Sequence, residues 1–251
     1  DAHGVTVSTD KGSKLTGRYL VAADGANSIV ARALGLRRKK VLGVALEAEV
    51  PANDLLMRTW GTEMFFSFGL VKRGYLWVFP KRRHLSVGIG TFGKTSQDIK
   101  GLLLEEMAER GLSLKGIPIR AHPLPAYRGR ELLHTHRAVL VGDAAGLVDP
   151  LLGEGIRYAV WSALIATQSI LDEDMAAYTC QVHKEIGMHL NMARLWAWLF
   201  YRYPRASFEL GVRNPYLTPD MIRMFNGNLT YGSMLLRIPK YVWGLLHRLE
   251  V

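Results

Sequence analysis

The chain has 251 residues, 49% of them hydrophobic and 22% charged, which provides for a globular core and excludes an intrinsically disordered chain. Its 32 basic and 22 acidic residues give a formal charge of +10, which favours an anionic partner such as nucleotide phosphates, nucleic acid or an acidic membrane surface. No apolar run reaches the roughly 18 residues that a membrane-spanning helix needs.

Other residue classes exclude further functions. The basic groups at 37–40 and 81–83 lack interleaved aromatic residues, so we expect solvated loops there and no nucleic-acid partner. The single Cys180 excludes an intrachain disulfide, fits a reducing, cytoplasmic location and predicts a buried, inert thiol. The histidine spacings do not resemble a zinc site, so no metal is expected. No Gly-x-Ser-x-Gly elbow supports hydrolase chemistry.

The first 40 residues predict two strands with a polar turn, then the strand "RYLVAAD" and the helix "NSIVARALGL", which ends near Gly35. Asn27 or Ser28 can cap that helix. The opening residues resemble the middle of a sheet, so we interpret the chain as the later part of a longer protein.

From residue 41 the texture changes to short aromatic or β-branched segments separated by charged turns, which predict an antiparallel sheet. The segment "TSQDIKGLLLEEMAERG" predicts a helix starting at Thr95 or Ser96. Proline-marked extended chain then leads to another strand and helix, and the chain is mostly helical from about Asp172 onward.

This order predicts a mixed α/β fold: an incomplete Rossmann-like nucleotide domain, an inserted antiparallel sheet and a helical tail. The expected parts are a nucleotide-binding domain in two pieces, a substrate domain made of the inserted sheet, and a carboxyl-terminal helical region. In chain order these ranges are 1–40, 41–125, 126–171 and 172–251, the first and third being the two pieces of the nucleotide domain.

The stretch "VLVGDAAGLVDPLLGEGIRYAV" at 139–160 is an apolar strand that ends in Gly142 and Asp143 and leads through a glycine-rich turn into a helix starting near Gly153. The carboxyl ends of such strands are where ligands gather in open α/β sheets. A helix amino terminus offers N–H groups to an anion. The alternative is a strand, a tight turn and a core helix without a ligand.

A second junction of the same build, "YLVAADGANSIVARALGL", ends its strand in Asp24 and Gly25. Either junction alone is weak evidence. Two of them, one on each side of the inserted sheet, predict aspartates at two strand ends, where carboxylates can accept hydrogen bonds from sugar hydroxyls.

These two stretches resemble the DG and GD motifs of flavoproteins built like aromatic hydroxylases. The finer resemblance is to the geranylgeranyl reductases, through "DPLLGEGIRYAVWSA" and "GYLWVFPKRRHLSVGIGTFG". It covers residues 5–171 and implies bound FAD, with NADPH or another electron donor. A complete fold of this kind begins with strand, GxGxxG and helix, which do not precede Asp24 here.

The resemblance implies which residues contact FAD. Asp143 would hold ribityl or ribose hydroxyls, Gly142 would permit close approach of the backbone, and Asp24 and Gly25 would lie near the dinucleotide. Pro150, Gly153, Gly155 and Ile156 would lie along the flavin ring and pyrophosphate. Arg32 is one position later than the arginine of the hydroxylase pattern. Glu154 is interpreted as a partner of the helix dipole rather than as a catalytic residue.

In "GYLWVFP", Tyr75, Trp77 and Phe79 fall on one face of a strand. That face is either core or the wall of a long apolar cavity for an isoprenoid chain, with Phe65 and Phe66 as additions from the neighbouring strand. The family resemblance favours the cavity.

The tail groups Ile238, Val242, Leu245, Leu246 and Leu249 on one helical face. Such a face either packs on the fold or lies on a membrane surface, in which case the protein is peripheral on the membrane.

The function that these inferences predict is an FAD-dependent reductase that saturates carbon–carbon double bonds of a prenyl chain. An FAD-dependent monooxygenase of the same fold and a non-catalytic lipid-binding module are the alternatives. The sequence identifies no proton donor.

Overall fold

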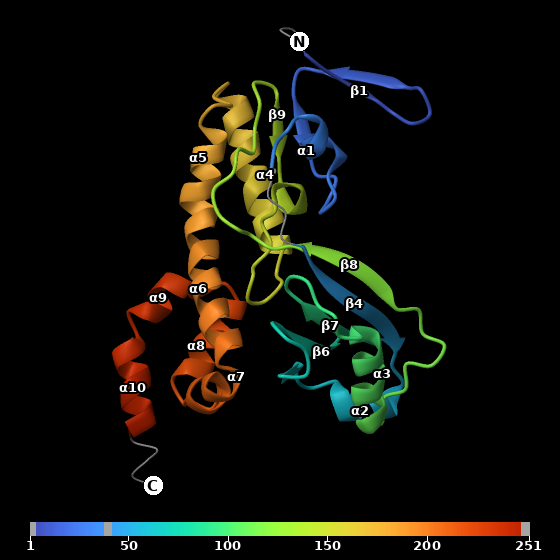
Figure 1. Ribbon diagram of the computed structural model, residues 1–251, viewed down its shortest axis with the longest axis vertical. Coiled ribbons are helices and arrows are strands. Elements are labelled where there is room, and N and C mark those ends of the chain that lie inside the picture. The colour runs from blue at the N-terminus through green and yellow to red at the C-terminus, as the bar shows by residue number, and fades with distance from the viewer. Residues whose placement is uncertain (1–3, 38–41, 247–251) are drawn as a thin grey trace. The chain divides into compact units, whose positions relative to one another are not determined.

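A computed structural model describes residues 4–37 and 42–246 (Figure 1). The chain forms two compact units. The first comprises residues 1–43 and 123–191, and the second comprises residues 44–122 and 192–251. Each unit has its own buried hydrophobic cluster, so each is held together by its own core.

The first unit contains the α/β part of the fold. An antiparallel hairpin, β1 (Val5–Ser8) and β2 (Lys14–Gly17), precedes β3 (Leu20–Ala22). Strand β3 pairs in parallel with β9 (Ala138–Leu140), with Ala22 opposite Leu140. Two segments on either side of the inserted sheet therefore build one parallel pair, which confirms the predicted interrupted α/β fold.

The helices of the first unit pack around β9. They are α1 (Ile29–Ala33), the 3₁₀ turn η1 (Gly142–Ala145), α4 (Ile156–Leu171), α5 (Tyr178–Val182) and the π-helical turn η2 (His183–Gly187), which continues into α6 (Met188–Arg202). Tyr178 is fully buried and its hydroxyl donates to the Leu140 carbonyl at 2.7 Å. Residues 178, 182, 186 and 190 recur at helical spacing and supply one side of this core.

The thiol of Cys180 corrects one expectation. Cys180 is exposed rather than buried. Its neighbours Tyr178, Thr179 and Val182 are buried, so α5 turns residue 180 away from the core.

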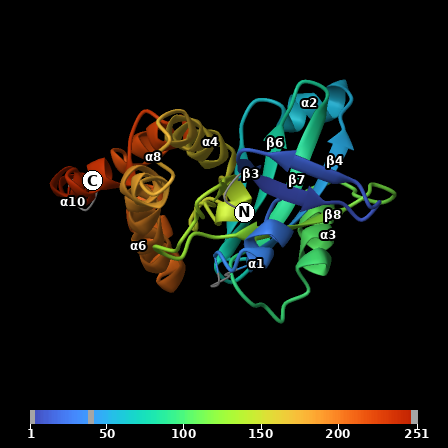
Figure 2. The same cartoon turned by 90° about the horizontal axis from the view of Figure 1, so that it is seen from above.

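The second unit is built on a five-stranded sheet of order β5-β6-β7-β4-β8. Strands β4, β6, β7 and β8 of this sheet are labelled in Figure 2. The strands are β4 (Leu42–Pro51), β5 (Phe65–Phe68), β6 (Gly74–Pro80), β7 (His84–Thr91) and β8 (Arg120–Pro125). Strand β7 pairs antiparallel with both β4 and β6, and β5 with β6, which confirms the predicted antiparallel sheet.

One face of this sheet is covered by α3 (Ile99–Glu109). Leu76 and Val78 of β6 are fully buried there, together with Leu103 and Met107 of α3. Helix α3 starts at Ile99, later than the predicted Thr95 or Ser96, because the Asp98 carboxylate accepts the Gly101 N–H at 2.9 Å and caps the helix. A further helix, α2 (Asp54–Trp60), lies between two of the predicted strands, in a stretch for which the sequence predicted no element.

The remaining helices of the second unit are α7 (Pro204–Ala206), the π-helical turn η3 (Ser207–Val212), α8 (Leu217–Phe225), α9 (Tyr231–Leu235) and α10 (Ile238–Leu246). Buried Asp220 of α8 accepts hydrogen bonds from the Tyr241 hydroxyl at 3.0 Å and from Arg237 at 3.0 and 3.1 Å. Burial alone would raise the pKa of Asp220, but these donors and Arg223 lower it. This cluster fixes α10 to α8.

Helix α10 packs through Tyr241, while Ile238 and Val242 of the predicted apolar face are 43% and 49% exposed. Leu245, Leu246 and Leu249 lie outside the residues whose side chains are described. Over residues 4–37 and 42–246, no helix has both the length and the hydropathy needed to cross a membrane.

Candidate functional site

Both aspartates that follow a strand lie at the same edge of the β3–β9 pair. Because these strands are parallel, their carboxyl ends coincide, and the Val141 N–H donates to the Ala22 carbonyl at 3.0 Å just beyond the last pair of the register. Asp24 follows β3 and Asp143 follows β9. The fold thus brings two junctions far apart in the sequence to one edge, where α/β folds bind ligands.

Asp143 presents an open carboxylate at this edge. Its side chain is half-buried, and burial raises its pKa while the nearby Arg37 guanidinium lowers it, with burial the larger effect. Within the described part of the chain, no donor hydrogen-bonds to this carboxylate, since the bonds at residue 143 involve its backbone. A ligand hydroxyl is the type of donor that this group can accept.

Glycines keep the space around Asp143 free. Gly142 has a φ of 53°, and its N–H donates to the Ser162 hydroxyl at 2.9 Å. A Cβ at Gly142 would lie 2.9 Å from the Ala159 Cβ. At Gly155, a Cβ would lie 3.3 Å from Asp143 Oδ1. Larger residues at position 155 would therefore crowd the carboxylate.

The turn between η1 and α4 is organised by Asp149, which the sequence analysis did not identify. Asp149 is 1% exposed, and its Oδ1 accepts the N–H groups of Leu151 and Leu152 at 2.7 and 2.9 Å. Its carbonyl accepts the Gly153 N–H at 2.9 Å, with Gly153 at a φ of 72°. This turn delays the start of α4 to Ile156, three residues beyond the predicted Gly153.

Three predicted residues line this turn and the first turn of α4. Pro150 and Gly153 are partly exposed, and Ile156 is 83% exposed. Glu154 Oε1 accepts the Arg157 N–H at 2.8 Å, which confirms that Glu154 is a partner of the helix start.

Asp24 has a structural role of its own. Its Oδ2 accepts the N–H groups of Ile29 and Val30 at 2.8 and 3.1 Å, while Ser28, the helix cap, accepts the Ala31 N–H at 2.8 Å. Burial would raise the pKa of Asp24, but the Ser28 hydroxyl and these backbone donors hold it below its ordinary value. Asp24 therefore stabilises the start of α1.

The other two residues predicted at this junction are less constrained. Gly25 adopts a φ of 78°, where a Cβ would meet nothing within 4 Å. Arg32 is exposed on α1, and its side chain makes no hydrogen bond or ion pair with any residue that the structure describes. The roles of Asp24, Gly25 and Arg32 toward a cofactor stay predictions.

Arg37 joins the two junctions, although the sequence placed it in a solvated basic loop. Its side chain donates to the Asp143 carbonyl, to the Ala144 carbonyl at 2.9 Å and to the Ala26 carbonyl at 2.7 Å. Arg37 is 6% exposed, so the expectation of a solvated loop is wrong for this residue. Arg38, Lys39 and Lys40 lie outside the described residues.

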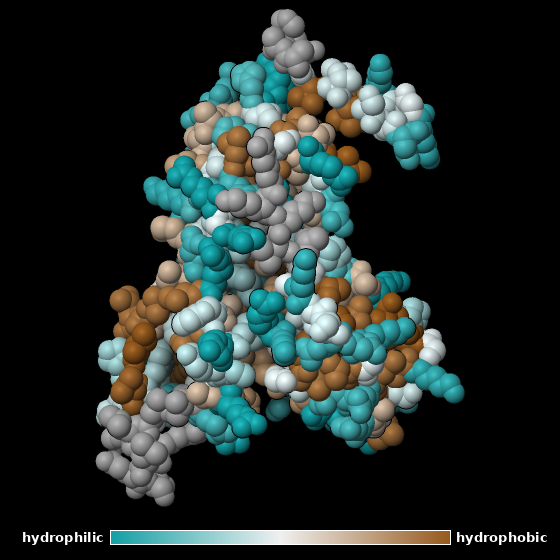
Figure 3. Space-filling view, viewed as in Figure 1, coloured by the Kyte–Doolittle hydropathy of each residue, from teal (hydrophilic) through white to brown (hydrophobic). Residues whose placement is uncertain are grey.

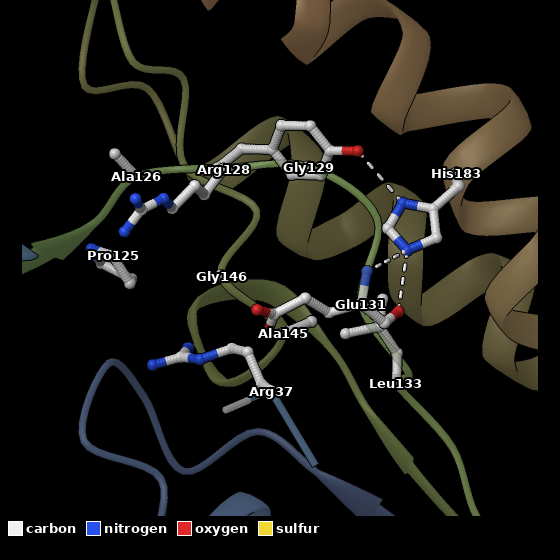
Figure 4. A pocket seen from close by; sticks show the side chains of 11 residues that line it. Arg37, Pro125, Ala126, Arg128, Gly129, Glu131, Leu133, Ala145, Gly146 and His183 are labelled. Carbon is white, nitrogen blue, oxygen red and sulfur yellow. Dashed lines mark hydrogen bonds between the residues drawn. The ribbon is translucent and has the colours of Figure 1, made fainter. Parts of the chain in front are cut away.

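A small pocket lies next to the residues that follow Gly142 and Asp143. Its lining includes Arg37, Tyr127, Ala145, Gly146 and His183 (Figure 4). It offers about 20 Å³ to a water-sized molecule, enough for a water and far too little for a flavin ring. His183 Nδ1 is 3.1 Å from the Tyr127 hydroxyl, and Nε2 is 2.9 Å from the Glu131 carbonyl. Burial lowers the pKa of His183, which favours the neutral ring.

In the second unit, Tyr75, Trp77 and Phe79 share the sheet face opposite Leu76 and Val78. The register places Phe66 beside Trp77 and Phe68 beside Tyr75. All five rings are partly exposed, and neighbouring centroids are 5.1–6.1 Å apart. We call Phe66, Phe68, Tyr75, Trp77 and Phe79 the aromatic row.

Phe65 does not belong to the aromatic row. It pairs with Val78 on the other face, contacts Trp60 edge-on at 5.6 Å and lies under the Arg110 guanidinium at 4.6 Å. The predicted addition of Phe65 to the wall is therefore wrong, because strand alternation turns it toward α2 and α3.

Strand β7 makes room for the Trp77 ring through glycine. A Cβ at Gly88 would lie 2.2 Å from the indole, whereas one at Gly90 would lie 3.5 Å from it. The indole N–H donates to the Ser86 hydroxyl at 3.3 Å, and that hydroxyl donates to Glu47 at 2.6 Å. The aromatic row thus borders a short polar chain on the same sheet face.

Comparison with known proteins agrees with this geometry. Residues 1–170 match the FAD binding domain family. The chain is 30% identical to geranylgeranyl diphosphate reductase of Synechocystis sp., over 80% of this chain and 53% of that protein. It is 38% identical to digeranylgeranylglycerophospholipid reductase 2 of Methanothermobacter thermautotrophicus, over 68% of this chain and 48% of that protein. The chain spans about half the length of these relatives.

Solved structures share the fold. A geranylgeranyl bacteriochlorophyll reductase-like protein of Thermoplasma acidophilum has a TM-score of 0.57 at 21% identity, covering 78% of this chain and 56% of that one. Anhydrotetracycline hydroxylase of Streptomyces rimosus has a TM-score of 0.54 at 20% identity, covering 82% and 44%. With the match over residues 1–170, the chain belongs to the FAD binding domain family of flavoprotein oxidoreductases and is similar to the geranylgeranyl reductases within it.

Proposed function

We propose that this chain forms part of an FAD-dependent reductase that saturates carbon–carbon double bonds of a prenyl chain. The observation that carries the proposal is the aromatic row, a partly exposed apolar surface on the sheet face opposite the α3 core. A long hydrocarbon needs a wall of this kind. The relatives named as geranylgeranyl reductases support the same substrate class.

The first unit fits FAD at the edge of the β3–β9 pair. We propose that Asp143 accepts hydrogen bonds from the sugar-alcohol hydroxyls, that Gly142 permits close approach of the backbone, and that Gly155 keeps the carboxylate accessible. Pro150, Gly153 and Ile156 supply the partly exposed turn and helix start beside it. FAD bound at this edge, once reduced by NADPH or another donor, would supply hydride.

Flavin retention tests these site residues without a turnover assay. Asp143→Asn is expected to lower flavin retention because an amide accepts hydroxyl donors more weakly than a carboxylate does. Gly155→Val should lower it by crowding Oδ1. The readout is flavin absorbance that co-elutes with protein on gel filtration. Asp10→Asn, an exposed aspartate in the β1–β2 turn, is the matched control, and equal loss in all three variants would contradict the assignment.

Mass spectrometry tests the reaction. The intact gene product, loaded with FAD and chemically reduced, is incubated with geranylgeranyl diphosphate without oxygen. The proposal predicts products heavier by two hydrogens per reduced bond. A substrate of unchanged mass would overturn it. In a parallel incubation with oxygen present, oxygen consumption coupled to an oxygenated product would instead support a monooxygenase of the same fold.

We further propose that the protein contacts a membrane surface through α9 and α10. Leu236 is 84% exposed, and Ile238, Val242 and Trp243 are 43–49% exposed. Hydrophobic residues gather at the surface over these helices in Figure 3. Partition of such a surface into a lipid interface is favourable. Sedimentation with lipid vesicles should fall for Leu236→Gln/Trp243→Gln, but not for Leu55→Gln, a leucine on α2 that is 71% exposed. Unchanged sedimentation of the double variant would exclude this contact.

A further inference from the structure

A second, larger pocket lies in the second unit, at the end of the aromatic row. Its volume is about 600 Å³, within the range typical of small-molecule sites. It is formed by the β5–β6 connection, the β7–α3 connection and the carboxyl end of α6. Nothing in the flavin site described above uses it.

The lining of this pocket carries three cations and no carboxylate. Lys72 and Arg73 come from the β5–β6 connection, and Lys94 comes from the β7–α3 connection. Thr95, Ser96 and Gln97 add hydroxyl and amide groups beside them. A concave surface with a single sign of charge concentrates ions of the opposite sign, so the expected guest is an anion.

The backbone that carries two of the cations is held in place. The Lys72 N–H donates to the Gln97 side chain at 2.9 Å, and its carbonyl accepts the Thr91 hydroxyl at 2.6 Å. The Arg73 carbonyl accepts the Phe92 N–H at 2.9 Å. These hydrogen bonds link the β5–β6 connection to the β7–α3 connection, so the backbone that carries Lys72 and Arg73 is fixed in position.

Arg73 itself adopts an unusual conformation. Its φ is 51°, a left-handed value that is strained for a non-glycine residue. The guanidinium packs against Gly93, where a Cβ would lie 2.8 Å from Nη2. Strained backbone and a glycine that accommodates the guanidinium together place this charge beside the pocket.

The lining of the pocket also includes aromatic residues. Phe200 and Tyr201 of α6 line it, and the Phe200 ring meets Phe68 edge-on at 5.0 Å. Phe68 is both a lining residue and a member of the aromatic row, in contact with Phe66 at 6.1 Å and with Tyr75 at 5.6 Å. The cationic pocket is therefore continuous, ring by ring, with the apolar face proposed for the hydrocarbon.

We propose that this pocket binds the phosphate end of an amphiphilic substrate whose hydrocarbon chain continues along the aromatic row. Lys72, Arg73 and Lys94 pair with the phosphate oxygens, and Phe68 and Phe200 contact the first carbons of the chain. The identity of the chain as prenyl rests on the proposed function. The phosphate site does not, because it follows from the charges of the pocket.

Calorimetric titration of the intact gene product tests the site with three probes: geranylgeranyl diphosphate, inorganic diphosphate and geranylgeraniol, which lacks the phosphates. In Lys72→Gln/Arg73→Gln/Lys94→Gln, the Kd for both diphosphates should rise about tenfold or more, while that for the alcohol stays within about twofold. Added salt should weaken diphosphate binding to the unmodified protein.

A second triple variant, Lys81→Gln/Arg82→Gln/Lys115→Gln, removes the same charge from exposed residues outside the pocket lining. It should leave the three Kd values within about twofold. If both triple variants weakened diphosphate binding equally, the effect would come from net charge alone, and the proposed site would be overturned. If the pocket triple variant does not fold, Lys94→Gln alone decides, since unchanged diphosphate binding in it would also overturn the site.

The variant Phe200→Leu distinguishes binding of the diphosphate from binding of the hydrocarbon chain. It should weaken geranylgeranyl diphosphate and geranylgeraniol, but not inorganic diphosphate. Anionic phospholipid vesicles distinguish the two sources of such a ligand: loss of vesicle binding in the pocket triple variant, with binding of soluble geranylgeranyl diphosphate unchanged, would overturn a site for a free prenyl diphosphate.

Failure of this inference differs from failure of the proposed function. Diphosphate binding that depends on the three cations, without any reduction of the chain, removes the reductase proposal and keeps the site. Reduction that continues unchanged in the pocket triple variant, with unchanged Kd, removes the site and keeps the reductase.

Discussion

Three backbone carbonyls of the GD and DG segments depend on one side chain, Arg37. Because Arg37 is buried, its guanidinium has little access to water and donates to these carbonyls instead. It also lies close enough to Asp24, Glu131 and Asp143 for their charges to raise its pKa, although burial acts more strongly and lowers it. Arg37 therefore fixes the edge at which the proposed flavin site is built.

Replacing Arg37 by Met should lower the free energy of unfolding by about 2–4 kcal/mol, because buried carbonyls lose charged donors. Arg37→Lys should recover only part of this, since one ammonium cannot reproduce the guanidinium fork. Urea denaturation measures both. Arg18→Met, at an exposed arginine of the same unit, should change stability by less than about 0.5 kcal/mol. Similar losses at Arg37 and Arg18 would refute this role.

At the scale of a strand, the aromatic row on β6 depends on the absence of a side chain at Gly88 of the neighbouring strand β7. Trp77 of β6 lies over Gly88 of β7, its partner in the register, so an aromatic side chain on one strand needs glycine on the next. At Gly90, two residues further along on the same face, a Cβ would be at an ordinary van der Waals distance of 3.5 Å from the indole.

This pair of glycines gives a matched prediction. Gly88→Ala should destabilise the protein by about 1–3 kcal/mol and change the Trp77 environment, because the new methyl overlaps the indole and the Leu46 carbonyl. Gly90→Ala should cost less than about 1 kcal/mol. Thermal unfolding and tryptophan fluorescence measure the two effects. Equal responses would show that the close approach at Gly88 does not constrain the sheet.

At the scale of the whole molecule, the burial of three histidines makes the free energy of unfolding depend on pH. His134, His183 and His189 have pKa values lowered first of all by burial. The unfolded chain therefore binds more protons than the folded one around pH 6.5. Their contribution to stability is present above that pH and is lost as the pH falls through the folded-state values.

Stability should accordingly decrease between pH 7.5 and 5.5, as measured by urea denaturation at each pH. His183→Gln should flatten this decrease, whereas His122→Gln, at an exposed position, should not. Asp143 acts in the opposite sense at lower pH, because burial raises its pKa and protonation then favours the folded state. A decrease that is unchanged in His183→Gln would show that His183 does not contribute to it.

The sequence by itself determined the features that depend on local pattern. Alternation in "GYLWVFP" predicted the strand face of Tyr75, Trp77 and Phe79, and the apolar runs that end in Asp24 and Asp143 predicted two strand-to-helix junctions, because strand and turn preferences act over a few residues. The resemblance of the same stretches to flavoproteins predicted the family that the match over residues 1–170 shows.

Only the tertiary structure decided which of these residues meet others far along the chain. The basic run at residues 37–40 gave no sign that Arg37 is buried against carbonyls of residues 26, 143 and 144, and helix α5 turned Cys180 outward although its composition suggested a buried thiol. The pocket that joins Lys72 and Lys94 to Phe200 draws on three separate segments. Such contacts depend on how distant elements pack, and no local pattern encodes them.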